Sequence, residues 1–237
     1  MKALLLAAGK GERLRPLTDT VPKPMMLIGG EPLLKHQILL LRDHGIREIW
    51  MNLSHRPQVI LDYFGNGESF GVKIDYFPEE VLLGTAGTAS RLRNYFKESF
   101  LVLYGDNLTD CNLTDLIQRH RQSAPLGTIV VFDRTRIPNS GMAGGRILFS
   151  SEGEIISFQE GGTMESPWVN AGIYVLEPEI FDFVPSTTPC DFAKDVFGKV
   201  IAAKGRLVVF PLEGYLFGID TPESYRKAKD YYQSIKK

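Results

Sequence analysis

Short apolar runs alternate with amphipathic helical patterns along almost the whole chain of 237 residues. The runs at 3–8, 48–53, 73–77, 100–104, 128–132, 171–176 and 207–210 are expected to be strands. The segments at 32–44, 57–64, 85–96, 113–122, 192–203 and 222–235 are expected to be helices. Several strand runs are apolar throughout, which is typical of strands buried on both faces of a mostly parallel sheet. The pattern therefore predicts an α/β fold with a doubly wound, mostly parallel mixed sheet.

Two local patterns add detail to this fold. The runs at 146–149 and 154–158 flank the turn-forming sequence Ser-Ser-Glu-Gly, so we expect a β-hairpin that forms a small antiparallel lobe. The last helix has a defined start, because Thr221 is a good N-cap and Pro222 suits the first helical position.

Composition excludes several classes of protein. The chain is 43% hydrophobic and 23% charged with a net charge of -1, which is typical of a globular domain and indicates no nucleic-acid or membrane surface. No apolar run approaches the ~20 residues that cross a bilayer, and no signal-peptide pattern is present. The two cysteines, Cys111 and Cys190, lie far apart and are expected to be reduced thiols of a cytoplasmic protein.

The first predicted strand runs into a glycine loop that is followed by cations. Gly9 and Gly11 allow backbone N–H groups to approach phosphate oxygens, and Arg13 and Lys23 add positive charge. A dinucleotide fingerprint would need a third glycine where Leu14 stands, and no P-loop string occurs. Because the loop follows a strand, it is expected at the carboxyl edge of the sheet, where such folds bind ligands.

Two further segments carry chemistry. The small residues at 84–88 allow a flat ring to lie close to the backbone, and Glu79 and Glu80 precede them. A carboxylate can accept hydrogen bonds from N1–H and N2–H₂ of guanine, which favours that base. Asp106 follows Gly105 at the end of a predicted strand and is well placed to hold Mg²⁺ together with phosphate oxygens.

Taken together, these segments resemble the sugar-phosphate nucleotidyltransferase family. Its signature GxGxRxxPxTxxxPKP is matched by Gly9, Gly11, Arg13, Pro16, Thr18, Pro22, Lys23 and Pro24. The resemblance runs from Lys2 to Tyr225 and is strongest to mannose 1-phosphate or D-glycero-D-manno-heptose 1-phosphate guanylyltransferases. It implies a Rossmann-like nucleotide-diphospho-sugar transferase fold in a single domain at 1–237, without the C-terminal β-helix of longer relatives. The nucleotide-binding part is expected at about 1–110 and the sugar-phosphate-binding part at about 111–237.

The resemblance implies a nucleotide site and its catalytic groups. The implied nucleotide-binding residues are Leu6, Ala7, Ala8, Gly9, Gly11, Arg13, Glu79, Glu80, Gly84 and Thr85. The base is expected beside the LGTAG motif at 83–87. Arg13 is expected to clamp the leaving phosphates, Lys23 to hold the attacking and α-phosphate oxygens, and Asp106 to bind Mg²⁺. Catalysis of this kind is mostly positioning and electrostatics.

The second Mg²⁺ ligand is less directly indicated. The family ends with DxGTPxxY, and here Gly218 stands in the position of the first aspartate, while Asp220 follows two residues later. Two positions along an extended segment preserve the side on which a side chain points. Asp220 is therefore expected to complete the metal site with Asp106.

The sugar end departs from the family pattern. The implied substrate-binding residues are Gly145, Glu160 and Asn170. In the family's FxEKP segment a lysine holds the sugar phosphate, but this chain has Gly161 there, and Arg146 is a candidate replacement. Asp191 and Asp195 resemble acidic positions of the penultimate helix and are expected to be structural.

These expectations combine into a reaction. An NTP and a sugar 1-phosphate would give an NDP-sugar and pyrophosphate, with GTP and mannose or heptose 1-phosphate favoured, as a step of nucleotide-sugar biosynthesis. Glucose 1-phosphate or N-acetylmuramate 1-phosphate with UTP, dTTP or CTP are alternatives. A non-catalytic nucleotide-sugar-binding regulatory protein is an alternative of another class, and pyrophosphate release separates it from an enzyme. A homodimer is compatible with the resemblance.

Overall fold

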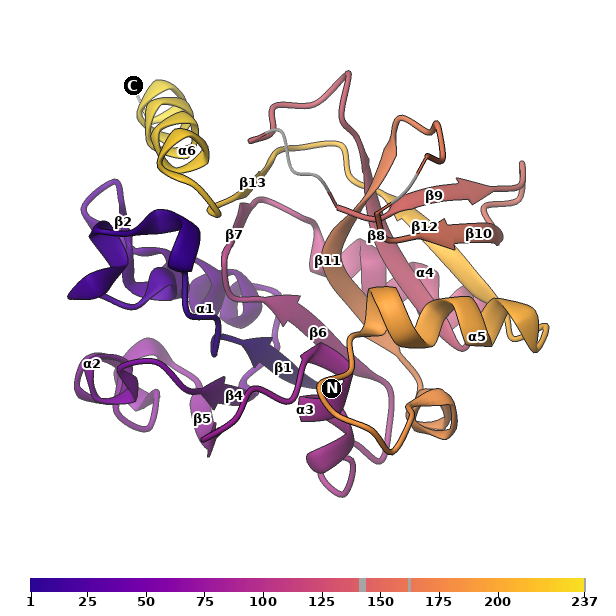
Figure 1. Ribbon diagram of the computed structural model, residues 1–237, viewed down its shortest axis with the longest axis horizontal. Helices are drawn as coiled ribbons and strands as arrows, with labels where there is room; N and C mark the ends of the chain where they lie inside the picture. Colours follow the sequence, from indigo (N-terminus) through magenta and orange to yellow (C-terminus); the bar gives the residue numbers. More distant parts are fainter. Residues whose placement is uncertain (141–143, 162, 237) are drawn as a thin grey trace.

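The computed structural model describes residues 1–140, 144–161 and 163–236, and a nine-stranded sheet runs through its centre (Figure 1). Its strands are β1 (Lys2–Leu6), β4 (Glu48–Leu53), β5 (Lys73–Pro78), β6 (Phe100–Tyr104), β8 (Gly127–Asp133), β9 (Arg146–Phe149), β10 (Ile155–Gln159), β11 (Trp168–Leu176) and β12 (Leu207–Pro211). The spatial order is β10-β9-β11-β6-β1-β4-β5, and β8 pairs with both β11 and β12. β1 is parallel to β4 and β6, β4 to β5, and β12 to β8, whereas β11 runs antiparallel to β6 and β8. The predicted mixed sheet is confirmed.

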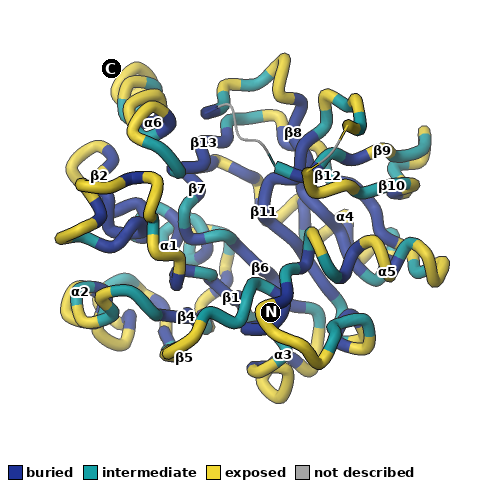
Figure 2. The backbone as a smooth tube through the Cα atoms, viewed as in Figure 1, coloured by how far each residue is buried: buried dark blue, intermediate teal, exposed yellow. Residues whose placement is uncertain are grey.

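Helices cover both faces of this sheet. They are α1 (Leu33–Asp43), α2 (Pro57–Phe64), α3 (Thr85–Arg91), α4 (Leu113–Ser123) and α5 (Phe197–Ala202), whereas α6 (Pro222–Ile235) packs against residues 27–28 and 216–218. Successive side chains of a strand point to opposite faces, so Leu5 joins the core beneath α1, α2 and α4, while Leu4 joins the core beneath α3 and α5. Figure 2 shows the buried sheet between helices whose outer surfaces are exposed. The doubly wound arrangement follows from strands that are apolar on both faces.

Some elements differ in detail from those predicted. The helix expected at 192–203 begins with a π-helical turn at Phe192–Val196 before α5. The hairpin β9–β10 forms as expected, but it extends the central sheet through the pair Val169↔Arg146 and is not a separate lobe. The ribbons β2 (Leu27–Ile28) with β3 (Glu31–Pro32) and β7 (Asn107–Thr109) with β13 (Leu216–Gly218) were not predicted. Strands of two or three residues are too short to show an apolar period.

The ribbon β7–β13 carries the C-terminal segment across to the carboxyl edge of the sheet. Gly218 pairs with Asn107, and Leu108 and Phe217 share a small core with Ala228 of α6. Because only Gly105 and Asp106 separate β6 from β7, this pairing fixes the residues that follow β13 beside the residues that follow β6.

Two expectations from composition can be compared with the structure. Cys111 and Cys190 are both free, as predicted, and both are buried. Among the described residues, no helix has both the length and the apolar character to span a membrane.

The start of α6 gives a first prediction. The Thr221 side chain accepts a hydrogen bond from the Ser224 N–H at 3.1 Å, and the Ser224 hydroxyl accepts one from the Thr221 N–H at 2.9 Å. Replacing Thr221 by Ala should lower the free energy of unfolding by ~1 kcal/mol, because the N-cap acceptor is lost. Thr221→Ser keeps the acceptor and should change stability far less. Urea unfolding measures both variants, and equal losses would contradict the capping role.

Candidate active site

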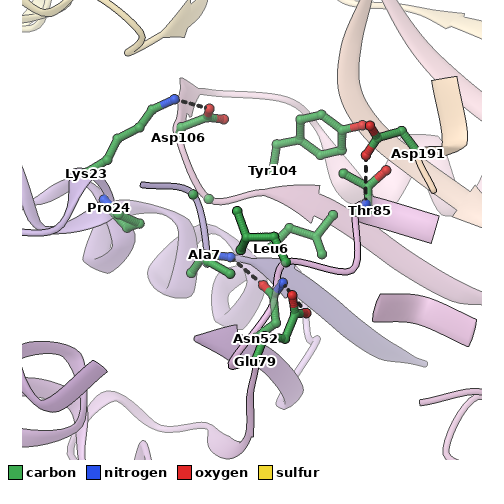
Figure 3. A pocket seen from close by; sticks show the side chains of 15 residues that line it. Leu6, Ala7, Lys23, Pro24, Asn52, Glu79, Thr85, Tyr104, Asp106 and Asp191 are labelled. Atoms are coloured by element: carbon green, nitrogen blue, oxygen red, sulfur yellow. Dashed lines mark hydrogen bonds and ion pairs between the residues drawn. The ribbon is translucent and has the colours of Figure 1, made fainter. Parts of the chain in front are cut away.

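A cavity of about 290 Å³ opens at the carboxyl ends of β1, β4 and β6 (Figure 3). The predicted site residues that line it are Leu6, Ala7, Ala8, Gly9, Lys23, Glu79, Gly84, Thr85 and Asp106. We call it the main cavity. An adjacent open hollow of about 510 Å³ is bordered by the predicted residues Gly11, Arg13, Lys23 and Asp220. Lys23 and Leu82 border both spaces, so a ligand that extends from one to the other would pass these two side chains.

The glycine loop packs tightly against later residues of the same sequence motif. Gly11 has a φ of 64°, and a Cβ added there would lie 2.9 Å from the Thr18 methyl and 3.0 Å from Lys23 Cβ. The Thr18 hydroxyl donates to the Gly11 carbonyl at 2.8 Å. Glycine is needed at this position because its conformation is left-handed and its neighbours leave no room for a side chain. The motif residues thus hold Lys23 in place.

Asn52 joins three elements at the floor of the main cavity. It stands at the carboxyl end of β4, where its Oδ1 accepts the Ala7 N–H at 2.7 Å and its Nδ2 donates to Glu79 Oε1 at 2.9 Å. Glu79 also accepts from the Thr88 hydroxyl at 2.5 Å and from the Leu83 N–H at 3.0 Å. A carboxylate has roughly four lone-pair sites, so after these three hydrogen bonds Glu79 has one site left to accept another. The network fixes the start of the 79–84 loop to the sheet.

The charged groups predicted for catalysis converge at the mouth of the cavity. The Lys23 ammonium donates to Asp106 Oδ2 and to Asp220 Oδ1, each at 2.5 Å. Arg13 Nη2 lies 3.1 Å from the same Asp220 oxygen, with its side chain 71% exposed toward the hollow. Two residues expected as metal ligands and two expected as phosphate ligands therefore form one cluster.

The fold explains how Asp220 reaches this cluster although it is displaced from the family position. The Ile219 N–H donates to the Asp106 carbonyl at 2.9 Å, directly after the β7–β13 pairing ends. Gly105 lies so close to β1 that an added Cβ would be 2.5 Å from the Leu6 carbonyl oxygen. The turn bearing Asp106 is thereby pressed onto the end of β1, and Asp220 is held next to it.

Charge balance keeps Lys23 protonated. Lys23 is only 8% exposed, and burial alone would lower its pKa. Asp106 and Asp220 outweigh burial and raise the pKa of Lys23 above its ordinary value. The ammonium therefore stays charged between two carboxylates that would otherwise repel each other.

Asp106 and Asp220 also fit Mg²⁺. Both supply carboxylate oxygens to one point, and Mg²⁺ commonly takes one or two protein carboxylates and completes its shell with phosphate oxygens and water. The described part of the chain contains no group of three or more His, Cys, Asp or Glu side chains arranged as metal ligands.

The predicted sugar-site residues lie together but border neither space. The Gly145 N–H donates to the Glu160 carboxylate, and the Asn170 N–H donates to the Gly145 carbonyl at 2.9 Å. Burial and the nearby Asp191 carboxylate raise the pKa of Glu160, although the Gly145 N–H opposes the shift. The Asn170 amide donates to the Tyr174 hydroxyl at 2.8 Å.

Arg146 does not lie on the same face of the sheet as Asn170. Arg146 pairs with Val169, and neighbouring strand residues point to opposite faces, so Asn170 points away from it. Burial and the nearby Arg134 lower the pKa of Arg146, and its Nη1 is buried without a hydrogen-bond partner among the described residues. The register thus gives no support to Arg146 as the substitute for the lysine absent at Gly161.

Sequence reasoning missed several residues of the main cavity. Asn52, Leu82, Tyr104 and Asp191 line it, whereas Glu80 is exposed and borders neither space. The polar residue Asn52, near the end of an otherwise apolar predicted strand, could have indicated a site residue from the sequence. Asp191 makes the structural contacts that were expected of it, and it also borders the cavity. Only long-range packing brings Asp191 there.

Comparisons with known proteins agree with this geometry. Residues 2–234 match the model of the nucleotidyl transferase family, and the chain belongs to that family. It is 35% identical to a UTP–glucose-1-phosphate uridylyltransferase of Synechocystis sp., over 100% of this chain and 63% of the relative. It is 32% identical to a mannose-1-phosphate guanylyltransferase catalytic subunit beta of Dictyostelium discoideum, over 98% of this chain and 64% of the relative. The chain thus spans less than two thirds of the length of these relatives.

A solved structure supports the same fold. HddC from Yersinia pseudotuberculosis, complexed with GMP-PN, superposes with a TM-score of 0.80 at 25% identity, covering 98% of this chain and 99% of that chain. The expected Rossmann-like fold of nucleotide-diphospho-sugar transferases is confirmed.

The ion cluster gives a second prediction, which needs no turnover. Replacing Lys23 by Met should lower the free energy of unfolding by about 1.5–3 kcal/mol, because two carboxylates lose a charged hydrogen-bond donor. Mg²⁺ should then raise the melting temperature of Lys23→Met more than that of the wild type, in which the ammonium competes for the same oxygens. Lys35→Met, which removes a surface partner of Glu31, is the control. Equal Mg²⁺ shifts in all three proteins would contradict shared use of the carboxylates.

Proposed function

We propose that the protein transfers a nucleotidyl group from an NTP to a sugar 1-phosphate, releasing pyrophosphate. The observation that carries this proposal is the convergence of Lys23, Arg13, Asp106 and Asp220 beside a cavity at the carboxyl edge of the sheet. The family match and the sugar-1-phosphate nucleotidyltransferases among the relatives support it. The main cavity and the adjacent hollow together offer the volume that ligand sites of this kind need.

Each charged group has a role in this reaction. A phosphate oxygen of the sugar 1-phosphate attacks the α-phosphorus of the NTP, the bond to the β-phosphate oxygen breaks, and pyrophosphate leaves. Lys23 holds the attacking and α-phosphate oxygens, and Arg13, exposed toward the hollow, binds the departing phosphates. Both cations stabilise charge that grows in the transition state. Mg²⁺, held by Asp106 and Asp220, supplies further charge neutralisation when bound.

GTP with mannose or heptose 1-phosphate is the favoured substrate pair. The guanylyltransferase relative and the HddC complex with GMP-PN support a guanine nucleotide. The second candidate is UTP with glucose 1-phosphate, which the 35% identical uridylyltransferase supports. We place the nucleotide-binding part at about 1–110 and the sugar-phosphate part at about 111–237, with Gly145, Glu160 and Asn170 on the sugar side.

A matrix of GTP, UTP, dTTP, CTP and ATP against mannose, heptose, glucose and N-acetylmuramate 1-phosphates tests the proposal, with pyrophosphate release as the readout. We expect turnover with GTP and mannose or heptose 1-phosphate. Turnover with UTP and glucose 1-phosphate alone would select the second candidate. Nucleotide-sugar binding without pyrophosphate release from any pair would indicate a regulatory protein and reject the enzyme.

The third prediction concerns the carboxylates. Asp106→Asn keeps the shape but removes charge, so kcat should fall by about 10²–10³, the scale of one preorganised electrostatic group. Asp220→Asn should raise the Mg²⁺ concentration needed for half-maximal rate. Asp182→Asn, an exposed carboxylate on the same chain, should change neither. Rates measured across a Mg²⁺ titration decide, and an unshifted curve for Asp220→Asn would remove it from the metal site.

The fourth prediction concerns the base. Glu79 lines the main cavity with one acceptor site left, so it should prefer the N–H donors of guanine over the acceptor at N1 of adenine. An unsatisfied buried group costs about 1–3 kcal/mol, or roughly 5- to 150-fold in kcat/KM between GTP and ATP. Glu79→Gln should narrow this ratio, whereas Glu80→Gln should leave it unchanged. A wild-type ratio preserved in Glu79→Gln would assign base reading to the backbone of 84–87.

A further inference from the structure

The start of α3 is held by residues that follow it by about a hundred positions in the sequence. The Thr85 N–H donates to Asp191 Oδ1 at 2.9 Å, as Figure 3 shows. The next two N–H groups, of Ala86 and Gly87, both donate to the Cys190 carbonyl, at 2.9 and 3.0 Å. The first N–H groups of a helix have no partner within the helix, and here all three are taken by one short segment.

The contact is reciprocal and very close. The Cys190 N–H donates to the Leu83 carbonyl at 2.9 Å, and the Phe192 N–H donates to the Thr85 hydroxyl at 2.9 Å. Gly84 has a φ of 77°, and a Cβ added there would lie 2.4 Å from the Cys190 carbonyl oxygen. We call residues 190–192 the tie. Its five hydrogen bonds place two backbones in direct contact, which explains the glycine of the LGTAG motif at this point.

The tie also forms part of the cavity wall. Asp191 lines the main cavity together with Gly84 and Thr85. The other end of this wall is anchored at Glu79 by Asn52 and Thr88. Residues 79–85 of the wall are therefore held at both ends. The contacts at Glu79 come from the first half of the chain, and those at Thr85 come from the second half.

The tie is packed against the residues predicted to hold the sugar. Phe192 and Phe197 stack with centroids 5.8 Å apart, and both contact the Tyr174 ring, at 6.0 and 5.1 Å. The Tyr174 hydroxyl accepts from Asn170, and Phe197 also contacts Phe158, two residues before Glu160. The position of the tie is thus set by the sugar side of the molecule.

We propose that Asp191 is a positioning residue for the nucleotide: through the Thr85 N–H it fixes the 79–85 wall of the nucleotide cavity from the sugar side. This inference rests on the proposed function for the nature of the ligand, while the tie itself is a property of the free protein. Asp191 is held in turn by Asp195, whose carboxylate accepts the Asp191 N–H at 2.7 Å and whose own N–H donates to the Asp191 carbonyl at 2.8 Å.

Equilibrium binding tests the proposal without turnover. GTP and UTP, each with Mg²⁺ and without sugar phosphate, are titrated into wild type, Asp191→Ala, Asp191→Asn and the exposed control Asp182→Ala. Loss of the charged acceptor should weaken binding of whichever nucleotide the wild type binds by about tenfold or more in Asp191→Ala. Asp191→Asn retains an oxygen that accepts the Thr85 N–H and should recover most of the affinity. Wild-type affinity in Asp191→Ala, or equal weakness of the Asn and Ala variants, would overturn the proposal.

A variant of Thr85 separates positioning from direct contact with the ligand. Thr85→Pro removes the N–H at a first helical position that tolerates proline. Gly84 precedes it with a ψ of 167°, outside the α region that proline disfavours, and has no Cβ that could clash with the proline ring. Adding Asp191→Ala to Thr85→Pro should cause no further loss of affinity, because their shared hydrogen bond is already gone. Thr85→Ala keeps the N–H, so Asp191→Ala should still weaken binding on that background. Additive losses with Thr85→Pro would show that Asp191 acts on the ligand directly and would overturn the proposal.

Hydrogen exchange in the free protein distinguishes failure of the tie from failure of the proposed function. The amides of 85–87 should exchange about tenfold or more faster in Asp191→Ala than in wild type, and at the wild-type rate in Asp182→Ala. Unchanged exchange in Asp191→Ala would reject the tie whatever the protein binds. Faster exchange together with a wild type that binds neither nucleotide would reject the nucleotide function, and with it the positioning role.

Discussion

The ion pairs of Lys23 with Asp106 and Asp220 are the interaction on which the rest of the site depends. They join three segments that are distant in sequence: the glycine loop after β1, the turn after β6 and the approach to α6. Backbone packing also positions the two carboxylates, since the Ile219 N–H donates to the Asp106 carbonyl. The cation then allows two carboxylates to lie close together without mutual repulsion.

Close backbone contact is the second constraint. Gly11, Gly84 and Gly105 each stand where an added Cβ would lie 2.4 to 2.9 Å from another atom. At Gly84 and Gly105 that atom is a carbonyl oxygen of the backbone, of Cys190 and of Leu6, so a shift of a side chain cannot relieve the clash. The three glycines allow loops from both halves of the chain to pack around one cavity at the carboxyl edge of the sheet. At Gly84 and Gly105, the close approach of another backbone explains why the residue is glycine.

The 79–85 wall of the cavity is held in place by several individually weak hydrogen bonds. One end of the 79–85 wall is bonded to Asn52 on β4, and the other end is bonded to the tie at 190–192. A single neutral hydrogen bond contributes only about 0.5–1.5 kcal/mol to stability, so each anchor depends on several hydrogen bonds. Together they fix a loop that would otherwise have to be ordered by a ligand, so a ligand bound in the cavity need not supply the free energy to order it.

The sequence by itself determined the alternation of apolar strands and helices and indicated that the glycine loop, Lys23 and Asp106 belong to one site, because these depend on short-range periodicity and on motifs of adjacent residues. The side of Asp220 followed from the period of an extended strand, but only the β7–β13 pairing placed its carboxylate against Lys23. The three-residue ribbon β7–β13, the tie at Asp191 and the opposite facing of Arg146 and Asn170 were decided by tertiary structure alone. Their contacts join residues tens to more than a hundred positions apart, and no local pattern encodes which distant backbone will satisfy a given N–H group.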